Sequence, residues 1–132
     1  GDCKEEVLDD GSSNYSSCAG IKSDSLFTMT AGTLTISSSG DGGKGINCNQ
    51  NVEVSGGTLD VRTTGTNYIA KPKGVKSDTD IILSGGSFTV NVEKSWACDN
   101  GSDSDEPADH VTIKGTPAET PTLYKKTVVV VY

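Results

Sequence analysis

Small or apolar residues alternate with polar ones along three segments of this chain, with the two-residue period of a β-strand. The segments align without a gap and read GIKSDSLFTMTAGTLTI, GINCNQNVEVSGGTLDV and GVKSDTDIILSGGSFTV, at residues 20–36, 45–61 and 74–90. No window of the sequence spaces its apolar residues at the helical period. Each copy therefore predicts three short strands and no helix.

A repeat this short cannot bury its apolar side alone, so it must stack on copies of itself. We predict an all-β protein, a single-stranded right-handed parallel β-helix of about four coils with capped ends. Residues at one offset in each copy then form buried columns, and the glycine-rich pairs form corners where a sharp turn is needed. The columns are Ile21, Ile46 and Val75; Phe27, Val52 and Ile81; and Leu34, Leu59 and Phe88.

The chain is predicted to be a single domain of 132 residues. Residues 1–19 are expected to cap the open end of the first coil, 20–115 to form the coils, and 116–132 to add a last strand and cover, to which Tyr124 and Tyr132 belong. The fourth coil is less regular than the others. Its best alignment puts Trp96 under Val75, Cys98 under Ser77 and Asp99 under Asp78.

Charge and hydropathy narrow the function classes. The formal net charge is -7 and the chain has one arginine, Arg62, which argues against a nucleic-acid partner. No apolar run is long enough to span a membrane.

The phrases GIKSD, DGGKGI and SGGTL, set about 25 residues apart, resemble a bacterial family of carbohydrate-binding domain-containing proteins. That resemblance implies a secreted or cell-surface β-helix that binds a polysaccharide, with polygalacturonate held with calcium in one member type. The function it implies is non-catalytic binding of a polysaccharide. The alternative is a structural or adhesive surface protein without a glycan site.

Two outward rows are candidates for that binding. Oxygen ligands from neighbouring coils could share a calcium ion, and nearby lysines could hold a uronic-acid carboxylate. Asp and Asn side chains at coil corners also commonly hydrogen-bond their own turns, so a purely structural role stays open. The candidate calcium ligands are Asp24, Asn49, Asp78 and Asp99, beside a row of Lys22, Asn47 and Lys76.

Sugar binding usually uses an exposed aromatic ring. Tyr68, in the long loop after the second copy and near Lys71 and Lys73, is the candidate platform. The alternative is that its ring folds back over the flank of the coil. Trp96 is not a candidate, because its predicted register points it inward.

Catalysis has little support in the sequence. Arg62 stands alone among threonines, and the single histidine, His110, has no nucleophile at a recognisable spacing. The acidic insertion at residues 100–109 could bind a metal, but it lacks the spacing of a known calcium loop, so a solvated loop is the simpler interpretation. We therefore predict a protein that is not an enzyme.

The four cysteines complete the predictions. In a secreted chain, Cys3 and Cys18 are expected to close the N-terminal segment with a disulfide. Cys48 and Cys98 are expected to lie two coils apart in one inward column and to be buried thiols.

Overall fold

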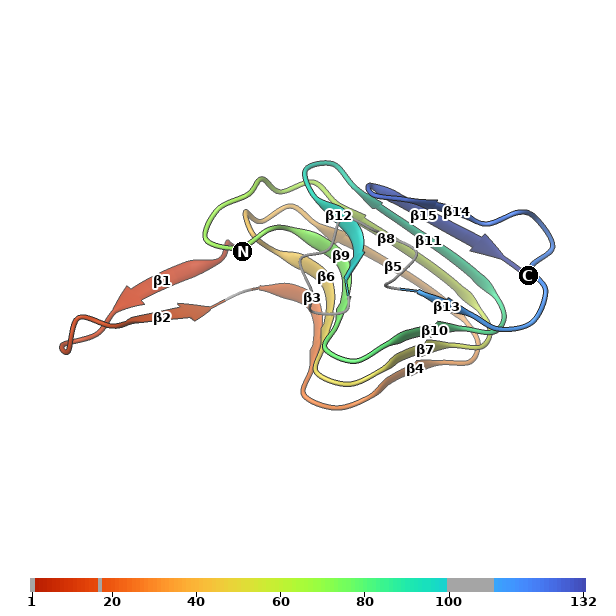
Figure 1. The fold of residues 1–132 in the computed structure, drawn as a ribbon, viewed down its shortest axis with the longest axis horizontal. Helices are drawn as coiled ribbons and strands as arrows, with labels where there is room; N and C mark the ends of the chain where they lie inside the picture. The colour runs from red at the N-terminus through yellow and green to blue at the C-terminus, as the bar shows by residue number, and fades with distance from the viewer. Residues whose placement is uncertain (1, 17, 100–110) are drawn as a thin grey trace.

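A computed structural model describes residues 2–16, 18–99 and 111–132. The described residues are all β, and their parallel strands stack as a β-helix (Figure 1). The acidic insertion at residues 100–109, considered above as a possible metal loop, and His110 lie outside the described residues. The described part of the chain contains no helix that could cross a membrane.

Three sheets form the faces of the β-helix, and each coil gives one strand to each face. The first sheet contains β3 (Ala19–Ser23), β6 (Lys44–Cys48), β9 (Lys73–Ser77) and β12 (Trp96–Asp99). The second contains β4 (Phe27–Met29), β7 (Val52–Val54), β10 (Ile81–Leu83) and β13 (Thr112–Ile113). The third begins with β5 (Thr33–Ser38), β8 (Thr58–Thr63) and β11 (Ser87–Val92).

The third face ends differently from the other two. β15 (Thr127–Val131) pairs antiparallel with β11, and β14 (Thr122–Tyr124) pairs antiparallel with β15. Within the described residues the β-helix therefore has three full turns and a partial fourth made of β12 and β13, slightly fewer than the predicted count of about four coils. The hairpin covers the edge of β11, buries Val128 and Val130, and brings the hydroxyl of Tyr132 to the carbonyl of Leu83 at 3.0 Å.

The core follows the predicted columns. Ile21 pairs with Ile46 and Ile46 with Val75, and the columns of Phe27 and Leu34 hold the same register through three coils. In these three columns the side chains of the second and third coils are fully buried, whereas those of the first coil are only partly buried. The corner glycines Gly32, Gly57 and Gly86 have φ of 83°, 83° and 78°, a region that residues with a Cβ rarely adopt.

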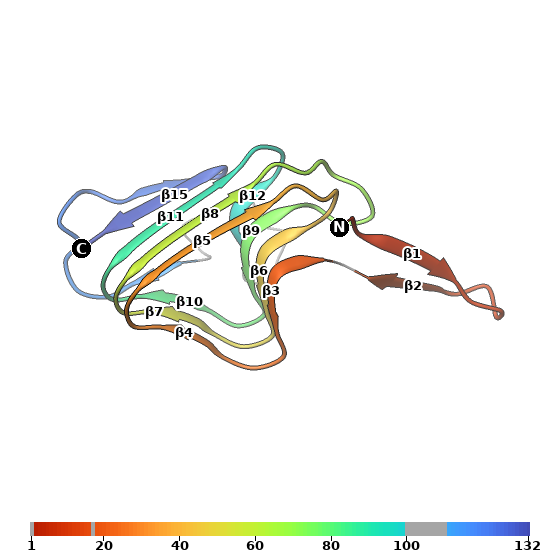
Figure 2. The ribbon, with the colours of Figure 1, turned by 180° about the vertical axis from the view of Figure 1, so that it is seen from behind.

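The N-terminal hairpin projects away from the first coil instead of lying over it. β1 (Lys4–Val7) and β2 (Ser13–Ser16) form an antiparallel hairpin that projects from the stack in both views (Figures 1 and 2). The two strands pair the backbone groups that face each other, and they form a two-stranded sheet of their own. Its base is held by Cys3, whose backbone N–H donates to the carbonyl of Asp41 at 2.7 Å.

Candidate functional site: a lysine-lined cavity

The first sheet places two rows of mostly charged or polar side chains next to each other. In its register, Lys44 lies beside Lys73 and Lys73 beside Trp96, while Asn47 lies beside Lys76 and Lys76 beside Asp99. Lys22 begins the second row on β3. A parallel β-helix thus converts one offset in the repeat into a line of neighbouring side chains.

A close approach at one glycine per coil shapes this sheet. A Cβ at Gly45 would lie 2.3 Å from Cγ1 of Val61, and one at Gly74 would lie 2.1 Å from Cγ1 of Val90. Only glycine allows the first sheet to reach the third face here. Figure 2 shows β3 turning sharply along its length, and the lysines that directly precede Gly45 and Gly74 lie outside the apolar core.

The first sheet and the loop between β8 and β9 line an open cavity of about 390 Å³, which we call the lysine cavity. The loop contributes two apolar residues and one lysine, and the sheet contributes three more lysines and one aspartate. The lining is Lys44, Ile69, Ala70, Lys71, Lys73, Lys76 and Asp99. A concentration of four ammonium groups is notable in a chain of net charge -7, because it creates a local positive field.

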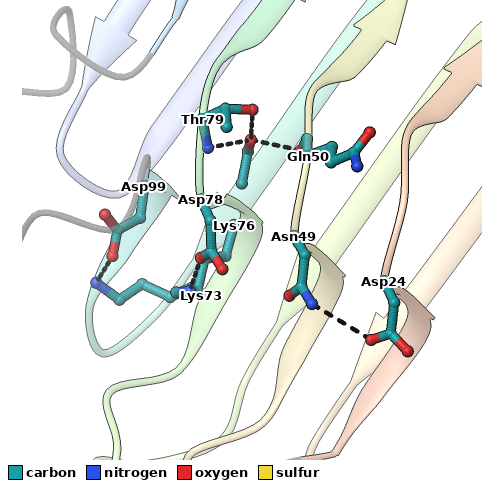
Figure 3. Close-up of polar contacts among 9 residues, drawn as sticks. Asp24, Asn49, Gln50, Lys73, Lys76, Asp78, Thr79 and Asp99 are labelled. Atoms are coloured by element: carbon teal, nitrogen blue, oxygen red, sulfur yellow. Dashed lines mark hydrogen bonds and ion pairs between the residues drawn. The ribbon is translucent and has the colours of Figure 1, made fainter.

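Two of these lysines have carboxylate partners, shown in Figure 3. Lys73 forms an ion pair with Asp99, and both side chains are 4% exposed. Lys76 forms an ion pair with Asp78 at 2.5 Å, and these side chains are 25% and 45% exposed. The first pair neutralises a buried charge, whereas water screens the second.

Lys44 is different. The residue is 6% exposed, and its Nζ donates to the carbonyl of Gly42 at 3.3 Å, but no carboxylate among the described residues pairs with it. Burial lowers the pKa of the Lys44 ammonium below its ordinary value, and the nearby positive charges of Lys76 and Lys73 lower it further. A buried ammonium without an anion is costly, so an anion entering this cavity would be stabilised by Lys44.

The indole ring of Trp96 lies close to the ammonium groups of three lysines. Its ring centroid lies 4.0 Å from Nζ of Lys71, 4.1 Å from that of Lys73 and 5.2 Å from that of Lys125. Contacts of this kind stabilise a cation over the face of the indole. The ring is buried, but it does not belong to the main apolar cluster, and its Nε1 has no hydrogen-bond partner in the described part of the chain.

The predicted register of the fourth coil was wrong by two residues. Cys98 pairs with Val75 instead of Ser77, Asp99 with Lys76 instead of Asp78, and Trp96 with Lys73 instead of Val75. The alignment had matched apolar with apolar residues, yet the indole of Trp96 is covered by lysine side chains rather than by the coil interior. Asp99 therefore lies in the lysine row and not at the end of the Asp24 row.

The row predicted to hold calcium is occupied by internal contacts. Nδ2 of Asn49 donates to Oδ1 of Asp24 at 3.3 Å, and the carboxylate of Asp78 is engaged by Lys76 (Figure 3). No group of three or more His, Cys, Asp or Glu side chains suited to a metal ion occurs among the described residues. In the structure Asn49 and Asp78 are each engaged by a neighbouring side chain, so a shared calcium ion would require Asn49 to turn its oxygen inward and Asp78 to leave Lys76.

The predicted sugar-contacting residues divide between two places. Lys71, Lys73 and Lys76 line the lysine cavity, and Asn47 lies in the row beside them. Lys22 is exposed on the first coil and does not line the cavity. Tyr68 is 62% exposed and does not fold back over the coil; it lines a second cavity on the other side of the same loop.

The structure contains no disulfide between Cys3 and Cys18. The hairpin strands pair Lys4 with Ser16, so backbone hydrogen bonds join the two strands at this end of the hairpin. Cys48 and Cys98 are buried thiols, as predicted, although they occupy different columns. Burial raises the pKa of the Cys98 thiol, and the nearby charge of Asp99 adds to the shift, so it behaves as a small apolar side chain.

Lys44 was missed by the sequence prediction. A signal for it was present, because a lysine directly precedes the first glycine of both the second and the third copy, at Lys44 and Lys73. The repeat alignment began at the glycine and so left this position out. What sequence alone could not show is that Lys44 is buried and that none of the described carboxylates pairs with it.

Comparison with known proteins agrees with the repeat pattern. The profile of a family described as Carbohydrate-binding domain-containing protein matches residues 19–124. No curated protein and no solved structure matches the chain. The match covers most of the chain, from the start of β3 to the end of β14. This protein therefore belongs to the carbohydrate-binding domain-containing family.

Proposed function

We propose that this protein binds an acidic polysaccharide without catalysing a reaction, and that the lysine cavity holds a uronic-acid carboxylate. Membership of a carbohydrate-binding family supports a saccharide partner. The observation that carries the acidic preference is Lys44, a buried ammonium that faces the cavity with no carboxylate partner among the described residues. A bound carboxylate would supply the missing negative charge.

The other lysines extend this preference. Lys76 is partly exposed, and water screens its attraction to Asp78. A ligand carboxylate can therefore compete with Asp78 for the ammonium group of Lys76. Lys71 is exposed and adds a positive charge at the loop side. Polygalacturonate, whose sugars all carry a carboxylate, is the reference ligand that the family resemblance suggests.

Two charged groups that could take part in proton transfer are already paired in the described part of the chain. Arg62 is on β8 and pairs with Glu93 at 3.4 Å, with both side chains substantially exposed. Asp99 is committed to Lys73. Neither group is placed to abstract a proton from a sugar bound at the lysine cavity.

The setting proposed for this activity is outside the cell, as a secreted or surface-attached bacterial protein, where such polymers occur. Calcium stays a prediction, and no step of the proposed binding passes through it. Since the lysines already provide positive charge, the carboxylate does not need a bridging ion to be held in a chain of negative net charge.

A glycan panel tests the proposal. Polygalacturonate and a neutral galactan of similar length are titrated by calorimetry in chelator and again in millimolar calcium. We expect polygalacturonate alone to bind in chelator and to bind more weakly at high salt, because partly exposed charges are screened. Lys76→Gln should weaken binding about tenfold, the value of one hydrogen bond to a charged group. Lys114→Gln, an exposed lysine that does not line the cavity, is the matched control.

Other outcomes separate the alternatives. Binding seen only in calcium would place the site at the Asp24 row. Preference for the galactan would remove the lysine cavity from the site. Failure of both polymers to bind would favour the structural or adhesive role.

A further inference from the structure

The cavity that contains Tyr68 has the opposite character to the lysine cavity. It measures about 430 Å³ and lies at the base of the hairpin; we call it the tyrosine cavity. Its lining holds three carboxylates, one ammonium group and one exposed aromatic ring. The residues are Asp2, Cys3, Lys4, Glu5, Asp41 and Tyr68.

Hydrogen bonds hold the three carboxylates of the tyrosine cavity in place. Oδ1 of Asp2 accepts from the backbone N–H of Asp41 at 2.9 Å, and Oε1 of Glu5 accepts from Ser13 at 2.6 Å. Asp41 accepts from the hydroxyl and the backbone N–H of Thr66 at 2.7 and 3.0 Å. These two bonds lower the pKa of Asp41 below its ordinary value, so its carboxyl group stays charged at neutral pH.

The two cavities are neighbours along the same two loops. Tyr68 lines one cavity and the next three residues line the other, in a tight turn where the N–H of Tyr68 donates to the carbonyl of Ala70 at 3.1 Å. Asp41 lines the tyrosine cavity and Lys44 lines the lysine cavity. They are three residues apart in the chain, so their Cα atoms lie within about 11 Å of each other. Figure 1 shows this stretch of the β8–β9 loop beside the N-terminal end of the chain.

Resting on the proposed function, we infer that the preferred ligand is a mixed polysaccharide in which a uronic acid alternates with an uncharged sugar. The uronate carboxylate occupies the lysine cavity, and the neighbouring uncharged sugar lies against Tyr68. A polymer made only of uronic acids is disfavoured, because its next carboxylate would enter a cavity lined by three carboxylates. Discrimination then comes from repulsion at one cavity as much as from attraction at the other.

The tyrosine cavity also suits an uncharged sugar on positive grounds. The exposed ring offers an apolar face to the C–H groups of a pyranose, and a carboxylate can accept hydrogen bonds from sugar hydroxyls. Each of the three carboxylates is held through one oxygen, which leaves the other for a ligand. Such a pairing of an apolar surface with fixed polar groups is what small-ligand sites require.

The test compares two polymers that share the same acidic sugar. The backbone of rhamnogalacturonan, in which galacturonate alternates with uncharged rhamnose, is titrated against polygalacturonate at equal uronate concentration and low salt. We expect the alternating polymer to bind at least about fivefold more tightly, the factor that one like-charge contact in water provides. Tyr68→Ala should weaken the alternating polymer and abolish most of its advantage.

Charge-removing variants sharpen the test. Asp2→Asn and Glu5→Gln keep one acceptor oxygen and the size of each side chain while removing the negative charge. The double variant should raise the affinity for polygalacturonate by about fivefold for each carboxylate removed and leave the alternating polymer nearly unchanged. Asp10→Asn makes the same change in the hairpin loop, at a residue that does not line the cavity, and is the matched control.

Two results would overturn the inference. If polygalacturonate binds as tightly as the alternating polymer, or if the double variant leaves their ratio unchanged, the tyrosine cavity does not select the neighbouring sugar, although the proposed function stands. If neither acidic polymer binds, the proposed function and this inference fail together.

Discussion

Replacing Leu59 by alanine is expected to lower the free energy of unfolding by about 3 to 4 kcal/mol, since a fully buried leucine loses both its burial and its packing. Leu59 is 0% exposed and lies in register with Leu34 on one side and Phe88 on the other. In a stack only a few side chains wide, the neighbouring side chains cannot move far enough to fill the space that the leucine side chain leaves. Urea denaturation monitored by the fluorescence of Trp96 measures the change.

Leu34→Ala is the matched control for this prediction. The residue type and the column are the same, but Leu34 belongs to the first coil and is only partly buried. We expect a loss of about 1 to 2 kcal/mol, in proportion to the smaller area removed from water. Equal losses in the free energy of unfolding for Leu34→Ala and Leu59→Ala would contradict this prediction, because the fully buried leucine should contribute more than the partly buried one.

Replacing Asp99 by asparagine is expected to cost about 3 to 5 kcal/mol, because it removes the carboxylate from the buried ion pair with Lys73. Both side chains are 4% exposed, so water cannot compensate for the loss. The same change should strengthen the binding of an acidic glycan, since it removes a negative charge from the lining of the lysine cavity. Chemical denaturation and glycan titration of the same variant measure the two effects.

Asp78→Asn provides the comparison, because it removes the carboxylate partner of the next lysine in a partly exposed pair. Its cost should stay below about 1 kcal/mol. If both variants lose the same stability, the difference in burial between the two ion pairs has no energetic consequence. If Asp99→Asn binds acidic glycans less tightly than the unmodified protein, Asp99 contributes to binding instead of competing with the ligand.

The repeat pattern was sufficient to predict the fold and its register through three coils. The columns that begin at Ile21, Phe27 and Leu34 all occur, because a two-residue period and a fixed corner leave one way to bury each apolar row. Prediction failed where the repeat decays. Trp96 was assigned to the interior for its apolar character, but a large indole can also be buried under the methylene chains of lysines.

The candidate site was predictable only in part, for a physical reason. Lys71, Lys73 and Lys76 were chosen from the sequence, and the structure places all three around one cavity. The loop that closes the cavity has no repeat to set its path, so the burial of Lys44 beneath it could not be foreseen. Tyr68 belongs to the same loop, so its position could not be foreseen either. It was expected beside Lys71 and Lys73, but it lines the tyrosine cavity.

The most direct test of the account is a titration of Lys44→Met with an acidic polysaccharide, followed by calorimetry and by the fluorescence of Trp96, the single tryptophan of the chain. Methionine keeps most of the volume of the side chain and removes its charge. Lys126→Met changes an exposed lysine that does not line the cavity and serves as the control. We predict that Lys44→Met lowers the affinity at least about tenfold, the contribution of a charged hydrogen bond, while Lys126→Met binds as the unmodified protein does. Equal affinity in all three proteins would contradict the assignment of the lysine cavity as the site that holds the carboxylate.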